Sequence, residues 1–305
     1  MMNEFSKYHP LVNFSYFTIV ILCTMFFMHP FSLIISISCG CAYSIILNGK
    51  AALKFNLLYM LPMLIVSALI NPAFNHEGVT ILAYLPNGNP LTLESIAYGI
   101  SAGTMIVSVI CWFSCYNAVM STDKFVYLFG RIIPSFSLIL SMILRFVPMF
   151  KNQIKVISNS QKCIGRDVSN GSLLTRMKNG ITILSIMITF SLENAIETAD
   201  SMKSRGYGMR GRTAFSIYRF DKRDKIALFS ILSLGAYVIF GAILGGMSYQ
   251  YFPMMKGVSI NLFMKGVPIN IYAITVFLGY FLLCATPIII EVWEDKKWKS
   301  MQSNI

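Results

Sequence analysis

Charged residues are scarce in this 305-residue chain. Asp, Glu, Lys and Arg together make up 12% of it, about half the usual share in soluble domains. Hydrophobic residues make up 55%. This composition excludes a disordered chain, which needs low hydrophobicity and high charge, and it leaves too few polar groups to cover a soluble globular protein. We therefore expect an integral membrane protein.

Motifs of the common catalytic sites are also missing from the sequence. There is no G-x-x-x-x-G-K-[ST] phosphate-binding loop, because the nearest Gly-Lys pair, Gly49-Lys50, has Ser44 and Ala51 at the other required positions. No H-E-x-x-H, paired Cys-x-x-Cys or nucleophile-elbow pattern occurs. We expect a chain that is not an enzyme, with no catalytic residues, no metal and no cofactor of its own.

The seven cysteines show neither a disulfide framework nor zinc spacing. Cys39, Cys41 and the i,i+4 pair Cys111 and Cys115 have the sulfur ligands that a soft metal prefers. We interpret them instead as small residues that allow close packing between helices.

Long apolar runs fill most of the chain. A bilayer core about 30 Å thick needs roughly 17–25 apolar residues in each helix, and six runs reach or approach that length. They are residues 11–28, 31–47, 55–70, 96–120, 226–247 and 269–292. Their central parts carry no charge, which argues against an ion-coupled pathway. Thr92 is the expected N-cap of the fourth run.

The basic residues orient these runs. Residues 151–225 hold 14 of the 25 Lys and Arg, whereas residues 71–95 hold none. Basic residues accumulate in cytoplasmic loops, so both termini and 151–225 are expected in the cytoplasm and 71–95 outside. Lys256 and Lys265 are exceptions in an outer loop. The net charge of +12 follows from this bias, and we expect no nucleic-acid partner.

The fold expected is an all-α polytopic membrane protein with about six transmembrane helices and a helical cytoplasmic region. Residues 1–120 would hold the first four helices and an outer loop near 71–95. Residues 121–225 would form the cytoplasmic helices, and 226–305 the last two spans and a cytoplasmic tail. Two apolar stretches, 125–150 and 181–199, either cross the membrane or lie along it, and we favour the second arrangement.

The second of these stretches continues as an amphipathic helix. Its polar face carries Glu193, Glu197, Asp200 and Lys203. The helix is expected to end at Gly206. Positive side chains suit this end because of the helix dipole, and they are Arg205, Arg210 and Arg212.

A short motif spans the end of this helix. Its residues, in order, are Ala199, Met202, Ser204, Arg205, Gly206, Tyr207, Gly208, Arg212 and Thr213. This order resembles the second of two Ala-Arg-Gly-type motifs in the transmembrane T components of energy-coupling factor (ECF) transporters, the CbiQ-like family. In that family each motif ends a cytoplasmic coupling helix. Ser204 stands where the family has alanine.

The first motif is expected earlier in the chain. The best match is the string Ser160-Gln161-Lys162-Cys163-Ile164-Gly165-Arg166. Gln161 and Gly165 fit the family pattern. Cys163 and Ile164 stand where alanine and arginine are expected, and Arg166 supplies a displaced charge.

The resemblance implies a scaffold subunit of a prokaryotic plasma-membrane importer for vitamins or transition-metal ions. It would join two cytoplasmic ABC ATPase subunits to one small substrate-binding membrane subunit, the S component. The residues implied in ATPase contact are Ser204, Arg205, Gly206, Cys163, Ile164, Gly165 and Arg166, supported by Gln161, Tyr207, Gly208, Arg210 and Arg212. The apolar faces of 125–150 and 181–199 would hold the S component.

Other functions remain open at this point. A stand-alone secondary transporter would move solute without partners, although the uncharged spans argue against it. A membrane-embedded enzyme acting on lipid would need His76 or Glu77 as a catalytic residue. The arginines near residue 205 can also be read as positive-inside or lipid-headgroup residues.

Overall fold

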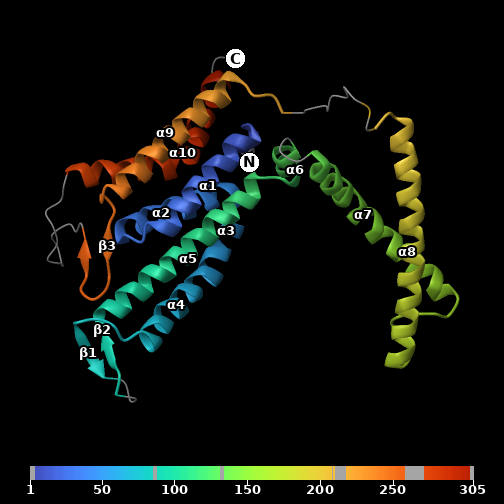
Figure 1. Cartoon of the computed structure of the whole chain (residues 1–305), viewed down its shortest axis with the longest axis horizontal. Coiled ribbons are helices and arrows are strands. Elements are labelled where there is room, and N and C mark those ends of the chain that lie inside the picture. Colours follow the sequence, from blue (N-terminus) through green and yellow to red (C-terminus); the bar gives the residue numbers. More distant parts are fainter. Residues whose placement is uncertain are drawn as a thin grey trace. The chain divides into compact units, whose positions relative to one another are not determined.

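A computed structural model describes residues 4–84, 88–130, 134–207, 209, 218–257 and 271–302. It divides into two compact units, one formed by Met1–Phe125 with Tyr218–Ile305 and the other by Val126–Ile217 (Figure 1). The second unit contains α7 (Pro134–Cys163) and α8 (Leu173–Ser204). Helix α6 (Thr122–Gly130) begins in the first unit and continues into the second.

The first unit is a bundle of helices with two small hairpins. Its long helices are α1 (Pro10–Phe26), α2 (Pro30–Asn48), α4 (Leu61–Phe74), α5 (Leu93–Val119), α9 (Lys222–Ile243) and α10 (Ile271–Gln302). Its shorter helical segments are a 3-10 turn (Phe5–Lys7), α3 (Lys50–Phe55) and a π-helical turn (Asn56–Met60). The antiparallel strand pairs are β1 (Ile81–Tyr84) with β2 (Pro90–Thr92), and β3 (Tyr249–Gln250) with β4 (Lys256–Gly257).

Local sequence explains where several helices begin. His-Pro pairs start both α1 and α2: proline suits the first helical position, and the preceding histidine caps the helix. His9 Nδ1 accepts from the Leu11 N–H at 3.3 Å, and His29 Nδ1 accepts from the Phe31 N–H at 3.2 Å. The N-cap expected at Thr92 is confirmed, because its Oγ1 accepts from the Ser95 N–H.

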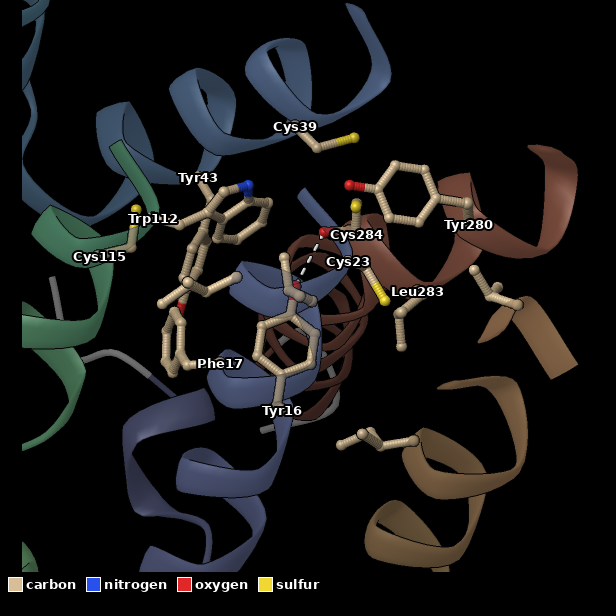
Figure 2. Packing of buried hydrophobic residues seen from close by; sticks show 14 of the residues in the cluster. Tyr16, Phe17, Cys23, Cys39, Tyr43, Trp112, Cys115, Tyr280, Leu283 and Cys284 are labelled. Atoms are coloured by element: carbon tan, nitrogen blue, oxygen red, sulfur yellow. Dashed lines mark hydrogen bonds between the residues drawn. The ribbon is translucent and has the colours of Figure 1, made fainter. Parts of the chain in front are cut away.

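The core of the bundle is aromatic, with a small polar network inside it. Tyr16, Tyr43, Trp112 and Tyr280 are fully buried (Figure 2). The Thr24 hydroxyl shares hydrogen bonds with Ser36 Oγ at 2.8 Å and Tyr280 OH at 3.1 Å, and Trp112 Nε1 donates to Ser36 Oγ at 2.9 Å. These bonds satisfy buried polar groups and tie α1, α2, α5 and α10 together.

Cysteine and glycine let α2 and α5 approach closely. A Cβ atom on Gly40 would lie 3.4 Å from the Trp112 ring and 3.5 Å from Cys111 Sγ. The thiol of Cys115 lies 3.8 Å from the Gly40 carbonyl oxygen. These contacts support the interpretation of the cysteines as packing residues. Among the described residues, no group of three or more His, Cys, Asp or Glu is placed to hold a metal.

The expected all-α polytopic membrane fold is confirmed. Six helices among the described residues are long and apolar enough to cross a membrane: α2, the continuous helix Lys50–Phe74, α5, α8, α9 and Ile271–Lys297 of α10. This set differs from the six expected spans. Helix α1, expected as 11–28, has only 17 residues, because the second His-Pro pair starts α2. Helix α8, which was not among the six expected spans, belongs to the observed set by its length and composition.

Candidate functional site

Helices α7 and α8 cross and run in opposite directions (Figure 1). Their contact is a small apolar cluster of Ile157 on α7 with Ile183 and Met187 on α8, each at most 8% exposed. Ser204 ends α8 about 26 Å past Met187, at 1.5 Å per residue. Cys163 ends α7 about 9 Å past Ile157 in the other direction. The two helix ends therefore lie on opposite sides of the crossing.

The end of α8 is closed by a glycine in the left-handed region. Gly206 has φ +73°, a backbone conformation that is energetically unfavourable for any residue with a side chain. Its N–H donates to the Lys203 carbonyl at 2.9 Å, and the Tyr207 N–H donates to the Met202 carbonyl at 3.0 Å. These two bonds form a Schellman cap, with Arg205 as the C-cap residue. The expected helix end at Gly206 is confirmed.

The end of α7 has the same cap. Gly165 has φ +82°. Its N–H donates to the Lys162 carbonyl at 3.0 Å, and the Arg166 N–H donates to the Gln161 carbonyl at 2.9 Å. We call residues 163–166 the first tip and residues 204–207 the second tip.

The shared cap gives a residue-by-residue correspondence between the tips. Cys163 matches Ser204, Ile164 matches Arg205, and Arg166 follows its glycine at the place of Tyr207. Arg166 is therefore on the other side of the glycine from the position of Arg205. The first tip has the same backbone shape as the second. At the position of Arg205 it has Ile164, an apolar side chain that is 69% exposed.

The first tip is held by the loop that leads into α8. The Asp167 carboxylate accepts from the Ser169 hydroxyl at 2.6 Å and from its N–H at 3.0 Å, and it lies 3.7 Å from Lys162 Nζ. The hydrogen bonds from Ser169 are the main reason that the pKa of Asp167 lies below its usual value. Asn179 Nδ2 also donates to the Asp167 carbonyl at 2.9 Å. The tip is thus fixed to the first turns of α8.

The second tip borders a groove of about 490 Å³ between α7 and the end of α8. Its lining combines two guanidinium groups, one carboxylate, hydroxyls and apolar side chains. The residues are Leu138, Ser141, Met142, Arg145 and Phe146 from α7, and Glu197, Thr198, Ser201, Met202, Arg205 and Tyr207 from α8. Guanidinium groups in such a groove can hold a carboxylate from another protein.

Sequence patterns did not select Arg145 or Glu197 for this site. Arg145 is the one basic residue in the apolar run 138–150, and that isolation is a signal that could have selected it. Its place in the same groove as Arg205 comes from the crossing of α7 and α8, which the local sequence does not encode. Three other expected site residues, Gly208, Arg210 and Arg212, lie outside the described residues.

The alternative catalytic residues, His76 and Glu77, lie between α4 and β1. His76 Nε2 lies 3.1 Å from Asn89 Nδ2, and the Glu77 carbonyl accepts from the Thr92 hydroxyl at 2.7 Å. The buried carboxylate of this region is Glu94, which is 2% exposed and accepts from the Thr80 hydroxyl at 2.7 Å and its N–H at 3.2 Å. These contacts fold the loop around β1 and β2.

Residues 5–215 match a family model described as CbiQ, cobalt transport protein. The chain belongs to the CbiQ family. Its matched segment contains both tips, and the resemblance seen in the motif at 199–213 is confirmed at the level of the family. The family places this membrane protein among the transport proteins of energy-coupling factor systems.

Curated relatives carry the name energy-coupling factor transporter transmembrane protein EcfT. The chain is 39% identical over 106 residues to the protein of Lactobacillus helveticus, which is 34% of this chain and 38% of that protein. It is 32% identical over 137 residues to that of Streptococcus thermophilus, 45% of this chain and 52% of the relative. These matches span about two-fifths to a half of each relative's length.

Proposed function

We propose that this CbiQ-family chain is the T component of an ECF importer for a vitamin or a transition-metal ion. It couples ATP hydrolysis in two cytoplasmic ABC ATPase subunits to movement of one small S component in a prokaryotic plasma membrane. It hydrolyses no ATP itself. Each tip docks one ATPase, with Arg205 as the principal contact of the second tip.

The observation that carries this proposal is the pair of identical caps. Two helix ends with the same backbone shape lie on opposite sides of one helix crossing. Such a pair can contact two copies of one partner protein at separate places. Because α7 and α8 cross at a packed cluster, displacement of one tip is passed to the other helix as a rigid-body movement.

The surfaces of α7 and α8 support an S component as the membrane partner. Each helix exposes apolar side chains four residues apart, which places them on one face. On α7 these are Ile139, Ile143 and Val147; on α8 they are Leu184, Ile188, Leu192 and Ile196, and each is at least 49% exposed. Apolar stripes of this length on a polar-ended helix are typical of a docking face for another apolar surface.

Charge supports a cytoplasmic place for both tips. The longest uncharged run of α8 lies between Lys178 and Glu193 and has 14 residues, fewer than the roughly 17–25 that a span requires. We therefore propose that α8 lies along the membrane or beneath it. The basic residues of 151–225 then face the cytoplasm with both termini.

Co-purification from the native membrane tests the proposal. The wild-type chain should recover two ATPase subunits and one S component. Arg205→Glu reverses the charge at the second tip and should lower ATPase recovery about tenfold or more, the scale of a lost charge-assisted contact. Lys155→Glu makes the same charge change on an exposed part of α7 away from both tips and should recover the subunits normally.

Two results would contradict the proposal. One is undiminished ATPase recovery with Arg205→Glu. The other is uptake of solute into vesicles that contain this chain alone, which would favour the stand-alone transporter.

A further inference from the structure

Two aromatic residues that precede α1, Phe5 and Tyr8, are buried in the bundle. Phe5 is 0% exposed and Tyr8 is 6% exposed. The Phe5 ring packs edge-on against Tyr16 with centroids 5.3 Å apart. We call residues 4–9 the strap.

The strap holds the place where the chain leaves the bundle. Lys124 lies two residues before the second unit begins at Val126 and is only 7% exposed. Its ammonium donates to the Ser6 carbonyl, to Ser6 Oγ at 3.0 Å and to the Val119 carbonyl at 3.1 Å. Three oxygen acceptors satisfy a buried ammonium, so removal of any one of them is costly.

The strap also holds the place where the chain returns. The His9 N–H donates to Asp224 Oδ1 at 3.1 Å, and Asp224 is 6% exposed. The other oxygen of Asp224 accepts from the Asp221 N–H at 3.1 Å, which closes the cap of α9. The His9 ring packs on Phe220 with centroids 4.9 Å apart.

A cation fixes the middle of the strap to the same helix. The Arg223 guanidinium lies 4.0 Å from the centre of the Tyr8 ring, within the range of a cation–π contact. It also pairs with Glu294 of α10 at 3.5 Å. One short segment therefore joins α5, α6, α9 and α10 where the chain enters and leaves the second unit.

We propose that the strap is a positioning element for transport. Through Lys124 and Asp224 it holds together the two chain crossings, which are the points where the chain leaves the bundle for the second unit and where it returns. The inference rests on the proposed function, because the movement that must be transmitted to the bundle is that of α7 and α8. Every covalent path between the second unit and the bundle passes through these two crossings. With the crossings fixed to one another, movement of the helices displaces the bundle instead of separating the crossings.

Hydrogen exchange on the full chain in lipid nanodiscs tests the strap without partner subunits. Lys124→Met keeps the length of the side chain and removes the charged contacts. Protection should fall about tenfold or more at the backbone amides of residues 9 and 222–225, the return crossing, as well as beside Lys124. Lys124→Arg should restore protection, and Lys50→Met, at an exposed lysine of the same unit, should not change it.

Loss of protection confined to the residues beside Lys124 would overturn the proposal. If Lys124→Met fails to fold, Asp224→Asn supplies the reciprocal experiment. Its lost protection should then extend to residues 119–125, and loss confined to α9 would overturn the proposal equally.

The assembled complex gives the functional readout. Lys124→Met should lower the amount of substrate moved per ATP hydrolysed several-fold, with recovery of the ATPases and the S component unchanged, and Lys124→Arg should restore the ratio. An unchanged ratio, or transport that falls only in proportion to subunit recovery, would overturn the proposed role of the strap. Absence of ATPases from the wild-type preparation would instead contradict the proposed function and leave the exchange test valid.

Discussion

At the scale of single residues, the two tips differ most at one position. Ile164 and Arg205 are both C-cap residues that precede a left-handed glycine, so their side chains leave the backbone in equivalent places. Under the proposed function, the second tip offers a guanidinium to its ATPase and the first tip offers an aliphatic side chain. The two docking contacts then have different strengths.

Ile164→Arg should strengthen the weaker contact. The side chain at 164 is 69% exposed, so an arginine fits there without repacking. A new charge-assisted contact is worth about 1.5–3 kcal/mol, and the ATPase released first from the wild-type complex should be retained at higher salt. Stoichiometry after salt washes measures this, and Ile164→Lys tests for charge without the planar fork. Unchanged retention in both variants would remove position 164 from the contact.

Gly206→Ala should weaken the second tip through its backbone. A Cβ atom is disfavoured at φ +73° and would lie 3.0 Å from Met209 Sδ, so the expected loss is about 1 kcal/mol or more in the stability of the helix end. Gly180→Ala lies within the same helix, meets nothing within 4 Å and should be neutral or stabilising by up to about 1 kcal/mol. Thermal unfolding of the two variants, followed by ATPase recovery, separates them; equal behaviour would contradict the cap.

Residue patterns predicted part of the site. Gly206 was expected from the sequence as a helix end because glycine follows an amphipathic run, and Gly165 fits the same signal. Arg145 was not expected in the groove, since α8 contributes Arg205 to the same groove from a segment far along the chain. The roles of both tips in docking remain predictions.

At the scale of elements, the β1–β2 hairpin depends on the start of α5. Strands β1 and β2 are short, and β1 is exposed along its whole length, so packing of the strand alone cannot stabilise the pair. The Glu94 carboxylate supplies the missing connection: it lies in the first turn of α5 and accepts two donors of Thr80 at the base of β1.

Glu94→Gln should destabilise this hairpin. The amide group of glutamine would place donors against the Thr80 donors, at a cost of about 1–3 kcal/mol. Glu77→Gln changes the same group type at an exposed position and should change the free energy of unfolding very little. Chemical unfolding in detergent measures both, and an equal effect of the two variants would contradict the role of Glu94.

At the scale of the whole molecule, composition was enough to predict the all-α membrane class, because scarce charge and long apolar runs leave few other folds. The boundaries of helices and strands were harder to predict from the sequence. The His-Pro pair at 29–30 shortened the first expected span. The pairing of β1 with β2 was not predicted, although Asn87-Gly88-Asn89-Pro90 is a turn signal. By length and composition α8 is a candidate to cross a membrane. Its location along or beneath the membrane remains a prediction from its charges.

The location of the first tip can be measured with a native residue. Cys163 is exposed, whereas each other cysteine is buried or half-buried. A membrane-impermeant thiol reagent should therefore label Cys163 in inverted vesicles that contain this chain without ATPase subunits, and leave intact cells unlabelled. Cys163→Ser should abolish the labelling and serves as the control. Labelling from outside intact cells would place the tip on the wrong side of the membrane for ATPase docking.

Photo-crosslinking from the tips tests the central claim most directly. A photoreactive phenylalanine analogue would replace Ile164, Tyr207 or, as a control on the bundle surface, Phe229, which is 76% exposed. The account predicts that the variants at 164 and 207 each crosslink to an ATPase subunit in native membranes, and that the variant at 229 does not. No ATPase crosslink from either tip, or an equal yield from position 229, would contradict it.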